Sequence, residues 1–68
     1  MKKYTVIFRD NENYDVFVSH VEAANPQAAF EEAALDHHVN SLLEDSSTFE
    51  LDEYRELANF EGHHENLA

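Results

Sequence analysis

The sequence has no cysteine, a single glycine, a single proline and only four basic residues among its 68. Without cysteine, disulfides, thiolate zinc sites and thiol nucleophiles are excluded, and a reducing compartment is favoured. One glycine cannot make a glycine-rich loop that cradles phosphates. The apolar runs are far shorter than the roughly 20 residues that span a membrane.

The length allows one domain, which we place at residues 1–68. A chain of this size buries only about 60% of the surface that its unfolded form exposes, so its core is thin. Folding is still favoured, because 43% of the residues are hydrophobic and five Phe and three Tyr are present. The apolar run near the start is interrupted by Arg9 and Asp10 and is too short for a signal peptide. We therefore expect a soluble, cytoplasmic protein.

Negative charge dominates the sequence. Fifteen Asp and Glu face four Lys and Arg, which gives a formal net charge of −11. Three of the four bases precede Asp10, and Arg55 is the only base after it. Such a surface repels nucleic acid and anionic membranes, so neither is expected as a direct ligand. It attracts basic protein surfaces, including those that hold phosphates.

The first third of the chain has the pattern of an antiparallel β-hairpin. Residues 3–9 and 14–21 are rich in β-branched and aromatic residues, which predicts two strands. Residues 10–13, Asp-Asn-Glu-Asn, favour the turn between them, because Asp and Asn accept left-handed backbone conformations. In the second strand Ser19 and His20 point to opposite faces, so they cannot pair as nucleophile and base.

A helix is predicted next. Asn25 is a preferred N-cap, and Pro26 suits the first helical position. Residues 30–37 place apolar side chains at helical spacing, which gives one face that packs on the hairpin. The helix is expected to stop near Asn40, and residues 41–48 suit a helical turn followed by a loop.

The last third of the chain is ambiguous between helix and strand. Apolar residues in 51–61 fit a helix by one spacing and a strand by another. A hairpin with one helix leaves a small core, which a third strand would enlarge. We therefore predict a strand at 54–61, ended by Gly62. The predicted fold class is α+β, with the order ββαβ.

Two stretches resemble small proteins of phages and prophages. One is the hairpin followed by residues 21–29, VEAANPQAA, and the other is residues 57–64, LANFEGHH. The resemblance implies the ββαβ fold and a setting inside a host cell. Small acidic phage proteins of this type include anti-CRISPR and anti-restriction proteins, some of which imitate DNA. The resemblance carries over no functional residue.

Carboxylates are concentrated at residues 44–56, where Arg55 is the only base. If this segment is extended, Glu50 and Asp52 lie about 6.6 Å apart, which is close to the spacing of successive phosphates. We take it as the candidate partner-binding segment, with one aromatic contact. Its residues are Glu44, Asp45, Glu50, Asp52, Glu53, Tyr54 and Glu56. The same charge also fits a solvated face that only keeps a small protein soluble.

Four of the five histidines form the adjacent pairs His37-His38 and His63-His64, and the fifth is His20. Histidine and carboxylate are suitable zinc or nickel ligands. Neighbouring side chains diverge on a helix and on a strand, however, so each pair offers one ligand. We predict no metal and no cofactor. One member of each pair should pack at the core edge and the other should be solvated, and the acidic field should favour protonation.

Catalysis is not predicted, because nothing marks a nucleophile or a buried pair of carboxylates. The charge predicts binding to a basic protein. The resemblance implies that the partner is a nucleic-acid-binding protein of the host, such as a CRISPR effector or a restriction complex. The alternative is an acidic accessory or scaffold protein, a homodimer formed through aromatic residues on an uncovered sheet face. The sequence leaves both open.

Overall fold

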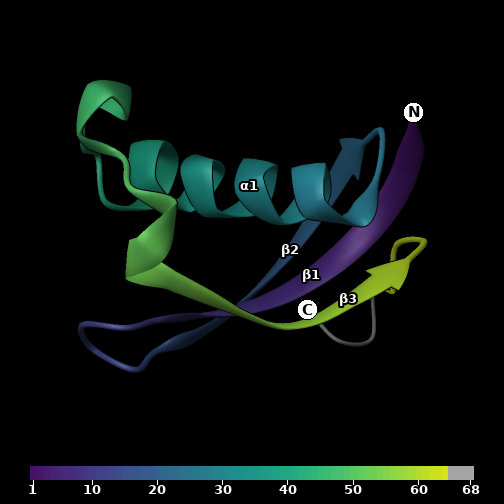
Figure 1. Cartoon of the computed structure of the whole chain (residues 1–68), viewed down its shortest axis with the longest axis horizontal. Coiled ribbons are helices and arrows are strands. Elements are labelled where there is room, and N and C mark those ends of the chain that lie inside the picture. The colour runs from purple at the N-terminus through teal and green to yellow at the C-terminus, as the bar shows by residue number, and fades with distance from the viewer. Residues whose placement is uncertain (65–68) are drawn as a thin grey trace.

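A computed structural model of the chain describes residues 1–64. Its main elements are β1 (Lys2–Asp10), β2 (Val16–Ala23), α1 (Pro26–Asp36) and β3 (Tyr54–Glu61), which confirms the α+β class and the order ββαβ. The strands form one antiparallel sheet in the order β2-β1-β3, and α1 lies across one of its faces (Figure 1). Within the described range, no helix is long and apolar enough to cross a membrane.

The core lies between α1 and the sheet. Tyr4, Val6 and Phe8 alternate along β1 and are buried under the helix. Small side chains on α1 let the helix approach the sheet closely: these are Ala29, Ala33 and Ala34. The ring of Phe8 is the centre of this core. It is surrounded, at centroid distances of 5.6–6.5 Å, by the rings of Phe17, Phe30, His37 and Tyr54.

The start of α1 confirms the predicted cap. The side chain of Asn25 accepts a hydrogen bond from the N–H of Ala28 at 2.9 Å, and Pro26 is the first helical residue. After α1 the chain continues as a π-type turn at His37–Ser41. The helical path therefore ends close to the predicted Asn40.

The third strand has the predicted bounds 54–61. Its pairing with β1 shifts between Ile7 and Phe8, which leaves Leu57 as the extra residue of a β-bulge. Gly62 ends the strand with φ 93°, a left-handed conformation that glycine adopts without a steric penalty.

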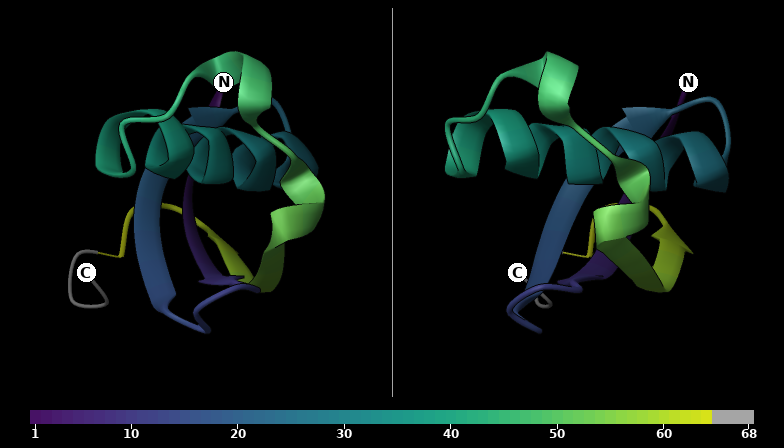
Figure 2. Two further views of the ribbon diagram at one scale, coloured as in Figure 1. Left: turned by 90° about the vertical axis from the view of Figure 1, so that its left-hand side faces the viewer. Right: turned by 60° about the vertical axis from the view of Figure 1, so that its left-hand side comes forward.

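Residues 42–53, called the connector below, join the end of the helical segment to β3. The connector contains two short 3-10 turns, Ser46–Thr48 and Leu51–Glu53. It leaves the helix layer and crosses one end of the molecule to reach the sheet layer (Figure 2). It thereby brings its acidic residues next to the hairpin turn.

The second face of the sheet, called the open face, carries no helix within residues 1–64. At one end it is covered by the chain after β3, because the Thr5 hydroxyl donates to the Gly62 carbonyl and accepts from the His64 N–H, both at 2.8 Å. Phe60 lies opposite Thr5 at this end, with its ring 5.8 Å from that of His64. Beyond this cover the strand register places on the open face Ile7, Arg9, Val16, Val18, Arg55 and Ala58. Apolar and basic side chains thus occupy a face where polar residues are usual.

Candidate partner-binding surface

The predicted acidic segment is not extended. A 3-10 turn at Leu51–Glu53 interrupts it, so Glu50 and Asp52 do not have the spacing of successive phosphates. The turn forms because Phe49 and Leu51, on either side of Glu50, both pack against the core. A row of carboxylates copying a nucleic-acid strand is therefore not present here.

Tyr54 belongs to the core, with only 6% of its surface exposed. At centroid distances of 5.8–6.1 Å its ring meets those of Phe8, His37 and Phe49. Burial raises the pKa of its hydroxyl, and the negative charges of Asp10, Glu53 and Glu44 raise that pKa further. Tyr54 is thus not available as the aromatic surface contact that the sequence suggested.

Three glutamates from separate segments surround a pocket of about 280 Å³, called the acidic pocket below. Glu12 comes from the hairpin turn, Glu44 from the start of the connector and Glu53 from its end. Asn11 holds the turn and the connector together, because its N–H donates to the Glu53 carbonyl at 2.9 Å. Its side-chain amide also donates, at 3.1 Å, to the carbonyl of Asp52. The pocket is completed by His38, Leu42 and Thr48.

No base within residues 1–64 pairs with the glutamates of the acidic pocket. The one ion pair in this range joins Lys2 Nζ and Glu61 Oε1 at 3.2 Å, at the opposite end of β3. The hydrogen bond between Glu61 and Lys2 raises the pKa of Lys2. The negative charge at the acidic pocket is therefore uncompensated, and it attracts cationic groups.

Two exposed leucines stand next to these carboxylates. Leu42 lines the acidic pocket, and the neighbouring Leu43 is 83% exposed. Leu43 also has a left-handed backbone, φ 57°, which costs a residue with a side chain about 1 kcal/mol. Because Leu43 is exposed, burial of its side chain does little to compensate for this strain.

The predicted residue Asp45 shapes the connector. Its carboxylate accepts the N–H of Ser47 at 2.9 Å and caps the following turn, which lowers the pKa of Asp45. Its carbonyl accepts from His38 Nε2 at 3.1 Å and from the Thr48 hydroxyl at 2.8 Å. Asp45 therefore has a structural role in addition to its exposed charge.

Of the predicted acids, Glu44 and Glu53 line the acidic pocket and the others do not. Glu50 and Asp52 are exposed on the connector. Glu56 is exposed on β3, where its carboxylate accepts the Asn59 amide at 2.9 Å. Glu12 was not in the predicted set, because no local pattern places the hairpin turn beside the connector.

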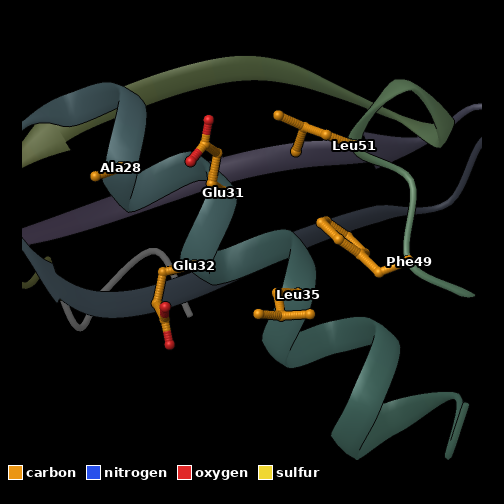
Figure 3. Close-up of a pocket in the computed structure, with 6 residues that line it drawn as sticks. All are labelled: Ala28, Glu31, Glu32, Leu35, Phe49 and Leu51. Atoms are coloured by element: carbon orange, nitrogen blue, oxygen red, sulfur yellow. The ribbon is translucent and has the colours of Figure 1, made fainter. Parts of the chain in front are cut away.

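A second pocket, of about 410 Å³, lies between α1 and the connector and is called the helix pocket below. Figure 3 shows Phe49 and Leu51 pointing from the connector toward α1. The helix contributes Ala28, Glu31, Glu32 and Leu35. These four residues lie outside the predicted binding set, since their spacing on the helix gives no sign that an aromatic ring lies beside them.

The prediction for His37 and His38 was wrong, because both are buried, at 7% and 5% exposure. The π-type turn directs His37 onto the Phe17 ring at 4.0 Å, while the connector covers His38 and accepts its hydrogen bond. Burial lowers the pKa of His37, although nearby Asp10 acts in the opposite direction. His37 thus protonates less readily than expected.

The second histidine pair also departs from the prediction, because His63 and His64 are both exposed. The ring of His63 stacks on that of His20 at 5.2 Å. In the part of the chain that the structure describes, no three His, Asp or Glu side chains converge in a way that could hold a metal ion.

Comparisons with known proteins gave no assignment. A scan against protein-family models, a search of curated proteins and a search of solved structures each returned no match. The chemistry of the surface therefore carries the functional argument.

Proposed function

We propose that this protein is a non-catalytic module that binds a basic protein through its acidic end. The acidic end consists of Glu12, Leu42, Leu43, Glu44, Asp45 and Glu53. The observation that carries the proposal is the acidic pocket, where three glutamates meet without a basic partner in residues 1–64. Like charges held together repel one another, and a cationic side chain from a partner relieves that repulsion.

The two leucines supply the apolar part of such an interface. Stable interfaces combine a desolvated apolar centre with a polar rim. Leu42 and Leu43 are exposed beside Glu44 and Glu53, so apolar and negative groups lie together. The net charge of −11 accelerates the encounter with a positive surface, and the leucines slow dissociation.

The partner we propose is a nucleic-acid-binding protein of a host cell, encountered in the cytoplasm. Surfaces that bind phosphates are strongly basic, which matches the charge of the acidic end. The resemblance to small phage proteins favours a CRISPR effector or a restriction complex. Because the carboxylates do not form a row with phosphate spacing, the proposed mode is competition by charge and not a copy of DNA geometry.

The test begins with capture. The protein is immobilised, a bacterial host lysate is passed over it, and bound proteins are displaced with duplex DNA and identified. The purified partner is then titrated with Glu44→Gln/Glu53→Gln. We expect affinity to fall by about tenfold or more, since two charge-assisted contacts are lost.

A control removes two carboxylates from the other end of the sheet, where Glu61 is paired with Lys2. Glu22 pairs with Lys3 and Glu61 with Tyr4, far along β1 from the hairpin turn. Glu22→Gln/Glu61→Gln should change affinity less than about threefold, an effect of net charge alone. Equal losses in the two double variants, or no loss in the first, contradict binding through the acidic end.

A second candidate function is dimerisation of an acidic scaffold through the open face. It is favoured by Phe60, which is 44% exposed and lies opposite Thr5 on that face. Three strands about 4.8 Å apart form a narrow face, well below the roughly 800 Å² per partner of standard interfaces, so the dimer would be weak. Sedimentation equilibrium should show an average mass that rises from that of the monomer toward that of the dimer as the protein concentration increases. Phe60→Glu should keep the mass of the monomer at all concentrations.

A further inference from the structure

The helix pocket has an apolar lining drawn from two elements. Leu35 and Ala28 come from α1, and Phe49 and Leu51 come from the connector, as Figure 3 shows. All four side chains are only partly buried, so the pocket is open to solvent and to a partner.

Phe49 is held in place from behind. Its ring stacks on that of Tyr54 with centroids 6.1 Å apart and an interplanar angle of 25°. The ring of His38 meets it edge-on at 5.5 Å. These contacts leave the ring fixed where it borders the pocket, so an incoming group meets a preorganised aromatic surface.

Two carboxylates border the apolar lining. Glu31 and Glu32 are exposed, and neither pairs with a base in residues 1–64. Neighbouring helical residues point about 100° apart, so the two carboxylates leave α1 in different directions, as in Figure 3.

We infer that the helix pocket accepts an arginine side chain of a partner protein. The inference rests on the proposed function, because it takes the partner to be basic. Apolar walls suit the methylene stem of arginine, and a fixed aromatic ring suits its planar guanidinium. One of the two bordering carboxylates, Glu31 or Glu32, accepts its N–H groups as charge-assisted hydrogen bonds.

The charge and the shape of the helix pocket favour arginine over an apolar side chain or a lysine. A neutral apolar side chain would desolvate Glu31 and Glu32 without supplying hydrogen bonds. Lysine carries the same charge, but its ammonium is strongly hydrated and cannot stack flat on Phe49. The pocket is also about 410 Å³, which accommodates a long side chain.

The test is an NMR titration of the full chain with N-acetyl-arginine amide, beside N-acetyl-lysine amide and the neutral N-acetyl-citrulline amide. We expect arginine amide to shift the methyl signals of Ala28, Leu35 and Leu51 and the ring signals of Phe49. Lysine amide should bind at least about threefold more weakly, and citrulline amide should cause no shift at these positions.

Two variants and one control locate the site. Glu31→Gln/Glu32→Gln keeps the shape of the pocket and should weaken arginine amide at least fivefold. Phe49→Leu keeps an apolar lining and should remove the preference for arginine over lysine. Glu22→Gln/Glu61→Gln removes equal charge elsewhere and should leave the titration unchanged. Circular dichroism verifies that each variant is folded.

Three results overturn the inference. They are equal binding of arginine and citrulline amides, equal binding of arginine and lysine amides, and shifts at the pocket that persist in Glu31→Gln/Glu32→Gln. The proposed function is tested separately by partner affinity in Glu44→Gln/Glu53→Gln. If Glu44→Gln/Glu53→Gln no longer binds the partner and arginine amide does not bind the helix pocket, the proposed function is supported and only this inference is contradicted.

Discussion

The two faces of the sheet come from alternate residues of the same strands, and they differ in both packing and charge. On the covered face, Val6 and Phe8 are fully buried beneath α1. On the open face, Arg9 and Arg55 lie opposite each other across β1 and β3. By the alternation of β1, Lys3 also belongs to this face, so three of the four bases of the chain lie on the side away from the helix.

The charge of the helix side is the opposite. Its two pockets are bordered by carboxylates from α1, from the connector and from the hairpin turn, namely Glu12, Glu31, Glu32, Glu44 and Glu53. Most bases thus lie on one side and the pocket carboxylates on the other, although Glu22 shares the open face with Lys3. The helix side therefore attracts basic partners, and the open face repels a second copy of the chain less strongly. The separation gives each proposed function its own surface.

The largest expected effect comes from truncating one phenylalanine on each face. Phe8 is 0% exposed, and Phe8→Ala should cost about 3–5 kcal/mol, comparable with the whole stability of a domain of this size. Phe60 is partly exposed, and Phe60→Ala should cost at most about 1 kcal/mol. Urea unfolding followed by circular dichroism measures both. Similar costs would mean that the open face is buried in solution, and a dependence on protein concentration would identify a dimer.

The next effect concerns acid. Burial lowers the pKa of His37 in the folded state, so the unfolded chain binds more protons as the pH falls below about 6.5. The contribution of His37 to the free energy of unfolding therefore decreases as the pH falls from about 6.5 to the lowered pKa of the folded state. Below the lowered pKa this contribution no longer changes. His37→Phe should remove this decrease and raise the melting temperature at pH 5 by several degrees.

The open face offers the control for this pH effect. His63→Phe makes the same substitution at an exposed histidine, so it controls for the exchange of an imidazole for a phenyl ring outside the core. Protonation of carboxylates also changes stability over this range, but it is common to all three proteins. An acid response that is the same in parent and His37→Phe would contradict the argument from burial.

The elements of the fold that were predicted correctly follow either from local preference or from the size of core that the chain needs. The cap at Asn25 and Pro26 depends on neighbouring residues only. The strand at 54–61 was favoured because a hairpin and one helix bury too little, and the observed sheet confirms it. In these cases local preference and the needs of the core agree.

The features that were missed depend on contacts between distant segments. The turn at Leu51–Glu53 forms where the connector packs against the core, and this packing also buries His38. Glu12 reaches the acidic pocket because Asn11 bonds to a residue far along the chain. Composition predicted the negative charge, but the places where carboxylates converge follow from tertiary packing.

The backbone strain of the connector gives a third prediction. Leu43 and Tyr14 both have positive φ, 57° and 61°. Leu43→Gly should stabilise the protein by about 1 kcal/mol, because glycine adopts this conformation freely. The same substitution should lower the affinity for the proposed partner, because it removes an exposed apolar side chain. Tyr14→Gly relieves the same strain but loses the contact of its ring with Arg9 at 5.1 Å, so its net gain should be smaller. Thermal unfolding and partner titration measure the two effects, and a Leu43→Gly variant that binds normally would exclude Leu43 from the interface.

The smallest expected effect tests the separation of charge directly. Neutralising an acid on the helix side should relieve repulsion, so Glu44→Gln should raise the melting temperature by about 2 °C. Neutralising a base on the open face should increase the imbalance, so Arg55→Gln should lower it by a similar amount. Both shifts should vanish in 0.5 M NaCl, where screening limits interactions between exposed charges to a few ångströms. Shifts of one sign, or shifts that survive the salt, would show that local contacts and not the opposed charges of the two faces determine the stability.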